Sequence, residues 1–187
     1  MNNKIDRRII KSRKLIQSTF LTMLIEDGFD EITVKRITDQ ADISRKTFYL
    51  HYIDKYDLLD TIVDSQMEEL EKICEQKKDK GFIEGTIIWF QYFEQNKGFF
   101  AALFASESTV SFRRRLLEFM ETQLRKKLIN ISSDKDPEIL LKFFSMAVLG
   151  IVESFLLDQL NANTEETARQ VGELLEQNIR SLQVSGE

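Results

Sequence analysis

The sequence has few of the residues that shape turns, disulfides and metal cages. Its 187 residues include one cysteine, one proline, seven glycines and one histidine. A single cysteine excludes an intramolecular disulfide and a cysteine-based zinc site, so we expect no metal and no cofactor, in a reducing environment. Sheets with many tight turns need glycine and proline, so their scarcity favours long helices with short connections.

Uninterrupted apolar runs are also missing. The apolar segment 143–157 is broken by Ser145, Glu153 and Ser154, and we expect no stretch of the roughly 18 residues that a membrane span needs. The N-terminus is polar and charged, without an apolar segment behind it, which predicts no signal peptide. We therefore expect a cytoplasmic protein with no membrane partner.

Positive charge is scarce overall but unevenly distributed. The net charge is −5, yet residues 1–55 carry 11 Lys and Arg against 8 Asp and Glu, a balance of +3, and the rest carries −8. Affinity for nucleic acid depends on local basic groups near phosphates rather than on the whole-chain sum. The asymmetry indicates a DNA-facing N-terminal part on an acidic body.

Apolar residues at spacings of three and four predict helices along most of the chain. In the first helix the predicted buried stripe is Ile9, Ile16, Phe20, Met23 and Leu24. The class is therefore all-α: an N-terminal three-helix domain (1–55) with a helix-turn-helix, and a C-terminal helical domain (56–187) for ligand binding and dimerisation. The predicted helices are 8–27, 33–41, 44–51, 54–80, 82–95, 99–105, 109–129, 137–160 and 163–182, with a loop at 130–136.

Helix boundaries carry the expected end signals. Gly28 stands where a left-handed residue would stop the first helix, and Thr33 and Ser44 are N-cap residues for two short helices. Asp42 and Ile43 form the turn between these helices. Pro137 occupies the first position of a later helix, which proline favours.

Residues 33–52 combine two short helices too small to bury a core alone. Such a pair places its second helix in the major groove of DNA. Phe48 is expected to turn inward against Ile37 and Ile43. The remaining side chains of the second helix supply cations and hydroxyls for phosphates and base edges.

Residues 8–59 resemble the DNA-binding domain of TetR/AcrR-family transcriptional regulators. The resemblance lies in Ala41–Tyr52, which contains a Thr-Phe-Tyr-x-His-Tyr run, followed by an Asp-Lys pair and by Leu58 and Leu59. Asp42 departs from the family pattern, in which glycine is usual at the turn. Aspartate tolerates a positive φ better than most residues, so we expect the turn to form.

The resemblance implies a set of DNA contacts. Lys35, Arg45 and Lys46 match positions that read base edges, and Arg36 also reaches the DNA. Phosphate contacts are implied for Thr47, Tyr49, His51 and Lys55, and for the caps Thr33 and Ser44.

Simpler readings of these residues stay open. The two caps could serve the helices alone, and Tyr49 or His51 could pack in the core. The basic residues at 7–14 could be a solvated helix face rather than a phosphate contact. Arg113–Arg115 could attract an anion, but pairing with Glu118 and Glu121 is the simpler reading.

The C-terminal part indicates a dimer. Helices 137–160 and 164–182 could form a four-helix bundle with those of a second copy. Ala147, Gly150 and Ser154 share a face of the first of these, and small residues permit close approach. The alternative is that Gly150 relieves crowding within the subunit.

Eleven of the fourteen phenylalanines follow Gly81. They could line an apolar effector pocket, or form an ordinary aromatic core. The segment 92–104 also resembles a Firmicutes-type subgroup of the same family. The pocket residues that we predict are Trp89, Phe90, Phe93, Phe100, Phe104, Phe119 and Phe144.

The sequence thus predicts a homodimeric regulator that binds palindromic half-sites in double-stranded operator DNA. Repression, relieved by a small apolar effector, is the family's usual mode. An alternative is a co-regulator whose C-terminal domain binds a protein partner and no small ligand. An enzyme is not expected, because helical metal bundles need Glu-x-x-His pairs and the one histidine lies in the DNA motif.

Overall fold

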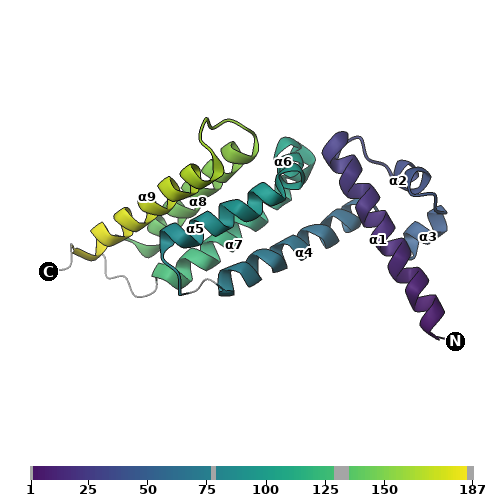
Figure 1. Ribbon diagram of the computed structural model, residues 1–187, viewed down its shortest axis with the longest axis horizontal. Helices are drawn as coiled ribbons and strands as arrows, with labels where there is room; N and C mark the ends of the chain where they lie inside the picture. Colours follow the sequence, from purple (N-terminus) through teal and green to yellow (C-terminus); the bar gives the residue numbers. More distant parts are fainter. Residues whose placement is uncertain (1, 77–78, 129–134, 185–187) are drawn as a thin grey trace.

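Three helices at one end of an elongated molecule are joined to a helical bundle at the other by α4 (Figure 1). The structure is a computed structural model and describes residues 2–76, 79–128 and 135–184. We call α1–α3 the head and α5–α9 the body. The elements are α1 (Asn2–Glu26), α2 (Val34–Gln40), α3 (Arg45–Tyr49), α4 (Lys55–Gln76), α5 (Phe82–Gln95), α6 (Lys97–Ala105), the 3₁₀ turn η1 (Glu107–Thr109), α7 (Val110–Leu128), α8 (Pro137–Leu156) and α9 (Thr164–Val184).

The head has the helix ends that the sequence predicts. Gly28, after α1, has a φ of +83°, a left-handed conformation that glycine adopts without a steric cost. The hydroxyls of Thr33 and Ser44 each accept a hydrogen bond from the amide three residues on, at 3.2 and 3.1 Å. Asp42 has a φ of +51° in the turn. These observations confirm the helix-turn-helix and both caps.

Only part of the length of α1 is packed against the rest of the head. Ile16, Phe20 and Met23 are fully buried, as predicted, but Ile9 is 48% exposed, so its assignment to the buried stripe was wrong. The helix also begins at Asn2 rather than near residue 8. Figure 1 shows the reason: the first turns of α1 extend past α3, where the head offers nothing to cover them.

Other boundaries differ from the prediction in small ways. Lys97 and Gly98 belong to α6, so Asn96 alone separates it from α5. α8 ends at Leu156 rather than near residue 160, because Asp158 adopts a left-handed φ of +56° that stops the helix. α4 stops short of its predicted end, and most of the predicted loop at 130–136 lies outside the described residues.

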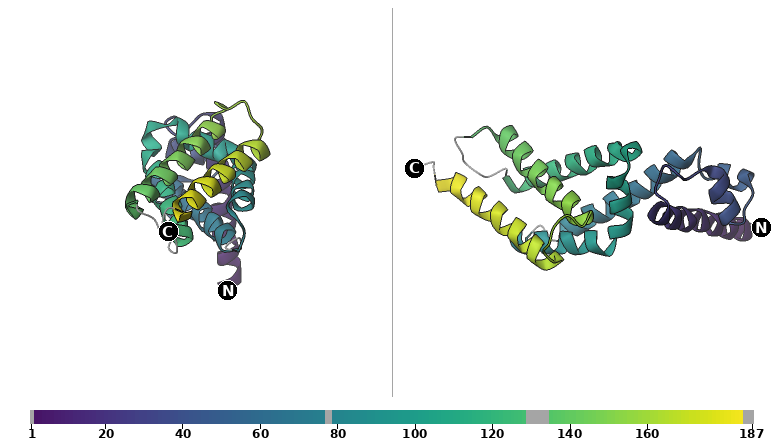
Figure 2. Two further views of the ribbon diagram at one scale, coloured as in Figure 1. Left: turned by 90° about the vertical axis from the view of Figure 1, so that its left-hand side faces the viewer. Right: turned by 90° about the horizontal axis from the view of Figure 1, so that it is seen from above.

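Aromatic rings fill the core of the body. Phe93 and Phe100 lie 4.9 Å apart at their centroids, and Phe90 packs edge-on against Phe155 at 5.3 Å, an arrangement that aromatic pairs favour. α5 runs along α9 (Figures 1 and 2). Gly172 permits this close approach, since a Cβ there would lie only 2.5 Å from the Cα of Ile83.

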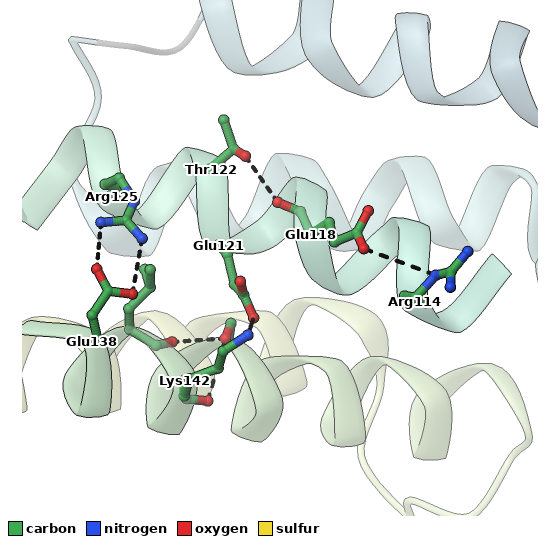
Figure 3. A network of polar contacts seen from close by, with 9 residues as sticks. Arg114, Glu118, Glu121, Thr122, Arg125, Glu138 and Lys142 are labelled. Carbon is green, nitrogen blue, oxygen red and sulfur yellow. Dashed lines mark hydrogen bonds and ion pairs between the residues drawn. The ribbon is translucent and has the colours of Figure 1, made fainter. Parts of the chain in front are cut away.

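Ion pairs fasten α8 to α7 (Figure 3). The guanidinium of Arg125 donates to both carboxylate oxygens of Glu138 at 2.7 and 3.0 Å, and Lys142 Nζ donates to Glu121 at 2.6 Å. The hydrogen bonds from Arg125 lower the pKa of Glu138. These contacts lie on one side of α8 and set which of its faces points outward.

α8 is also the one helix in the described part of the chain that is long and apolar enough to cross a membrane. The expectation that no segment meets this test was therefore wrong, because Glu153 and two serines do not offset the surrounding apolar residues. A core helix of a soluble protein passes the same test, so this single helix is weak evidence.

Candidate nucleic-acid interface

α3 presents its polar side chains outward because one aromatic residue anchors its other face. Phe48 is fully buried, and its ring packs edge-on against Tyr49 at 5.6 Å. Arg45 and Lys46 are exposed, and Tyr49 is 58% exposed. A short helix held by one buried ring therefore projects two cations and a phenol into solvent.

The head also holds cations that no acid neutralises. Within the described residues, Lys35, Arg45 and Lys46 are exposed and form no ion pair, and the same holds for four cations on the first turns of α1: Arg7, Arg8, Lys11 and Lys14. Unpaired cations on one end of a molecule attract a polyanion. α1 crosses beside α2 and α3 (Figure 1), so both groups belong to the same end of the molecule.

Two of the predicted contacts are turned back toward the protein. Arg36 donates to Asp27 Oδ2 at 2.6 Å and to the carbonyl of Glu31 at 2.8 Å. Lys55 Nζ donates to the carbonyl of Phe29 at 3.1 Å and lies 4.4 Å above that ring. Both cations hold the connection between α1 and α2 in place in this structure.

The three serine and threonine residues among the predicted contacts have local partners but remain accessible. Ser44 Oγ lies 2.9 Å from Thr47 Oγ1, and Thr33 caps α2 as described above. Ser44 and Thr33 are exposed and Thr47 is half-buried. A hydroxyl that accepts one bond can still donate another, so capping and phosphate contact are compatible.

His51 is held against α1. Its Nε2 lies 2.7 Å from Ser12 Oγ, and the neighbouring Tyr52 Oη accepts a hydrogen bond from Arg13 Nε at 3.4 Å. Burial, and then the nearby charge of Arg13, lower the pKa of His51. The imidazole is therefore neutral at pH 7 in the free protein.

A polar contact that the sequence did not reveal links the head to the body. The carboxylate of Asp30, in the connection between α1 and α2, accepts hydrogen bonds from Ser106 Oγ, at 2.9 Å, and from Ser108 Oγ. These two bonds, with Lys55, lower the pKa of Asp30. Nothing in the local pattern pairs residues so far apart in sequence.

Comparison with known proteins places both parts of the chain. Residues 21–62 match the model described as bacterial regulatory proteins, tetR family, and residues 80–177 match TetR_C_8, a transcriptional regulator C-terminal region. The second match alone covers more than half of the chain. The chain belongs to the TetR family.

Relatives of this TetR-family protein agree in fold. It is 38% identical over 68 residues to YxbF, an uncharacterized HTH-type transcriptional regulator of Bacillus subtilis (strain 168), a match that covers 36% of this chain and 18% of that relative. The solved structure of a TetR-family regulator from Syntrophomonas wolfei str. Goettingen superposes with a TM-score of 0.73 at 19% identity, over 91% of this chain and 95% of that one. The dihydroxyacetone kinase operon activator DhaS superposes at 0.69 and 20% identity, over 93% and 99%. TetR-family proteins are DNA-binding regulators rather than enzymes, and they act as dimers on operator DNA.

The body of this TetR-family protein contains a cavity of about 240 Å³ at the end remote from the head. Its apolar wall includes Phe82, Trp89, Phe90, Met120 and Leu124. Of the predicted pocket residues, Trp89 and Phe90 line this cavity. Three cationic lining residues were missed: Lys80, Lys126 and Lys127.

The other five predicted pocket residues do not line this cavity. Phe93, Phe100 and Phe104 are buried in the ring cluster of the core. Phe119 stacks on Trp89, with the ring centroids 5.7 Å apart, and Phe144 is buried in α8. Each of these rings contacts another aromatic ring, and none of them lines the cavity, a difference that composition alone could not distinguish.

An apolar face of α8 is left open in the subunit. Ile139, Phe143 and Met146 are each at least 60% exposed. Ala147 and Gly150 are exposed on the same face and Ser154 is half-buried. A Cβ at Gly150 would meet nothing within 4 Å, so this glycine does not relieve crowding inside the subunit.

Proposed function

We propose that two copies of this chain bind a palindromic operator, each placing α3 in the major groove of one half-site. The observation that carries this proposal is the outward, unpaired cationic surface of Lys35, Arg45 and Lys46 above the buried ring of Phe48. Arg45 and Lys46 read base edges from the start of α3, where guanidinium and ammonium groups pair with guanine. Lys35 reads from α2.

Phosphate contacts then come from the surrounding hydroxyl and imidazole groups. Tyr49, Thr47 and His51 supply them on α3 and just beyond it, with the caps Thr33 and Ser44 as further donors. We assign Arg36 and Lys55 to phosphates reached while their side chains remain attached to the α1–α2 connection, so their main effect is to position the head.

The exposed face of α8, together with α9, forms the proposed dimer interface. Ile139, Phe143 and Met146 are too apolar to remain exposed in a row, and Leu174 adds an exposed apolar residue on α9. Ala147, Gly150 and Ser154 let the two copies of α8 approach closely. The ion pairs of α8 with α7 keep this face pointing outward.

We propose repression as the mode of action. A dimer that occupies its operator blocks transcription without any further contact, whereas activation needs a surface for the transcription machinery. The solved neighbour DhaS is an activator, so the fold supports both directions. A reporter gene behind the selected operator, with and without the protein, tests the direction.

Release by a small apolar effector is part of the same proposal. The cavity touches the last turns of α4, and α4 begins at Lys55 beside the head, so a ligand that moves α4 changes the separation of the two heads. The concave apolar lining, which includes Phe82, Trp89 and Phe90, favours this over a body that binds only a protein partner. We place the protein in the cytoplasm, where operator DNA lies.

The experiment that tests DNA binding is selection of bound duplexes from a random pool. We expect a palindrome whose half-sites are separated by about one helical turn, 34–36 Å. Affinity is then measured by fluorescence anisotropy against salt, where each phosphate contact contributes about −0.9 to the slope of log affinity against log salt. Absence of any enriched sequence, with only weak salt-dependent binding, would refute the proposal.

A further inference from the structure

The cavity of the body combines an apolar wall with a group of lysines. Phe82, Phe90 and Met120 contribute to its apolar wall, and three lysines line it: Lys80, Lys126 and Lys127. One acid, Glu75, lines it as well. The lining thus carries three cations against one acid, in a chain with a net charge of −5.

Two of the lysines have weak acidic partners that an anion can replace. Lys126 Nζ lies 3.3 Å from Glu75, and Lys80 pairs with Glu84. The two acids are 57% and 61% exposed. Exposed ion pairs contribute little to stability because water screens them, so exchange for a ligand anion is inexpensive.

Gly85 indicates that the space is kept open. It lies inside α5, where glycine is less favourable than alanine because it loses more chain entropy. It lines the cavity, and a Cβ there would meet nothing within 4 Å. A side chain could therefore fit but would reduce the volume available to an occupant.

From these observations we infer that the cavity binds a small amphipathic anion, with its apolar body inside and its anionic head at Lys126 and Lys127, and that this ligand is the effector. The inference rests on the proposed regulatory function and names the ligand class for it. A volume of about 240 Å³ limits the occupant to a small molecule. The polar side chains of Thr86 and Gln123 also line the cavity and can bond to the head group.

The test uses octanoate with the purified 187-residue protein, and octan-1-ol and octylammonium as matched neutral and cationic probes. Trp89 is the one tryptophan of the chain and lines the cavity, so its fluorescence reports occupancy directly, and calorimetry gives the affinity. We expect octanoate to bind about tenfold more tightly than octan-1-ol, the effect of a charge-assisted hydrogen bond, and octylammonium not to bind. Equal affinity for the acid and the alcohol would overturn the inference.

Two variants locate the site. The double variant K126Q/K127Q should weaken octanoate binding about fivefold to tenfold and leave octan-1-ol binding unchanged, whereas K72Q, on an exposed lysine of α4 outside the cavity, should change neither. Gly85→Leu should abolish binding of both probes, with Gly85→Ala as a milder step. Undiminished binding in Gly85→Leu would place the ligand elsewhere and refute the site.

Operator affinity, measured in the same preparation, separates this inference from the proposed function. DNA binding that weakens on addition of octanoate supports both. DNA binding without octanoate binding, or octanoate binding that leaves operator affinity unchanged, overturns the effector assignment and leaves the DNA-binding regulator in place. Octanoate binding in a protein that selects no DNA overturns the regulator instead.

Discussion

The head and the body treat their cations in opposite ways. In the body, Arg113 pairs with Glu153, Arg115 with Asp60 and Asp64, and Arg125 with Glu138. In the described part of the head, the exposed cations of α3 and of the first turns of α1 have no acidic partner. The body uses charge to join its helices to one another and to α4, whereas the head, apart from the Arg36–Asp27 pair, leaves these cations available to a binding partner.

The head and the body also differ in how many aromatic side chains they bury. The body has a broad cluster of phenylalanines from the four helices α5–α8, whereas α3, with five residues, depends on the single buried ring of Phe48. A reading helix needs most of its side chains outside, so it can contribute few to a core. The head is therefore the part whose function and stability compete for the same few residues.

The largest expected effect comes from removing the anchor of α3. Phe48→Ala should lower the free energy of unfolding by about 3–5 kcal/mol, because a buried ring is replaced by a cavity. Urea unfolding followed by circular dichroism measures it. Leu50→Ala is the matched control: Leu50 is 73% exposed, and its loss should change stability by less than about 0.5 kcal/mol. Equal effects for the two variants would contradict the anchoring role.

Next in size is the loss of base contacts. Arg45→Ala and Lys46→Ala should each cost about 1–3 kcal/mol in operator affinity and relax sequence preference at one base pair. Tyr49→Ala should weaken binding to all sequences alike, because it removes a phosphate contact. Anisotropy with selected and scrambled duplexes distinguishes the two patterns. The control is Arg180→Ala, at an exposed arginine of the body paired with Glu176, which should change neither operator affinity nor sequence preference. An equal loss of affinity for selected and scrambled duplexes in the Arg45 and Lys46 variants would argue against base reading by α3.

The link between the two regions gives a smaller effect. Ser106→Ala removes the hydrogen bond to Asp30 and should lower the free energy of unfolding by about 0.5–1.5 kcal/mol. Ser111→Ala, on an exposed serine of α7, is the control. The pKa of Asp30 is lowered from 3.8 in the folded protein. This stabilisation is therefore complete above pH 3.8 and is lost as the pH falls through the pKa of the folded state. The difference between wild type and Ser106→Ala should therefore narrow on acidification below 3.8; a constant difference would exclude Asp30 as the partner.

The smallest effect concerns His51. Burial lowers its pKa from 6.5, so the fold favours the neutral imidazole. This contribution to stability is complete above pH 6.5 and is lost as the pH falls through the pKa of the folded state. Bound phosphates favour the imidazolium instead. Operator affinity should therefore rise about twofold to fivefold between pH 8 and pH 6, the range of an exposed ion pair. His51→Gln should flatten this profile, and an unchanged profile in the variant would assign the proton to another group.

Much of the head could be predicted from sequence because its determinants are local. A cap, a left-handed turn residue and the spacing of apolar residues act within a few positions, so Thr33, Ser44, Asp42 and Phe48 were assigned correctly. Ile9 was assigned wrongly because its exposure depends on where α3 ends in space, beside a helix that extends past it. Periodicity reports which face a residue lies on but not whether another element reaches that face.

The body shows where sequence reasoning stops. Phenylalanine is equally suited to a core and to a pocket wall, so Phe93 and Phe100 could not be separated from Trp89 and Phe90 before the packing was known. The pairing of Arg115 with α4 and of Asp30 with Ser106 joins residues that are distant in the chain. Such contacts depend on tertiary arrangement, for which spacing gives no signal.

The length of α4 has a mechanical consequence. Its 22 residues at 1.5 Å each form a rod of about 33 Å. If its far end is pivoted by about 5°, the other end sweeps through about 3 Å, which is close to the 3.4 Å rise between successive base pairs. A displacement of a fraction of an ångström near Cys74, at one end of α4, thus becomes a displacement of the head by almost one base pair along the duplex.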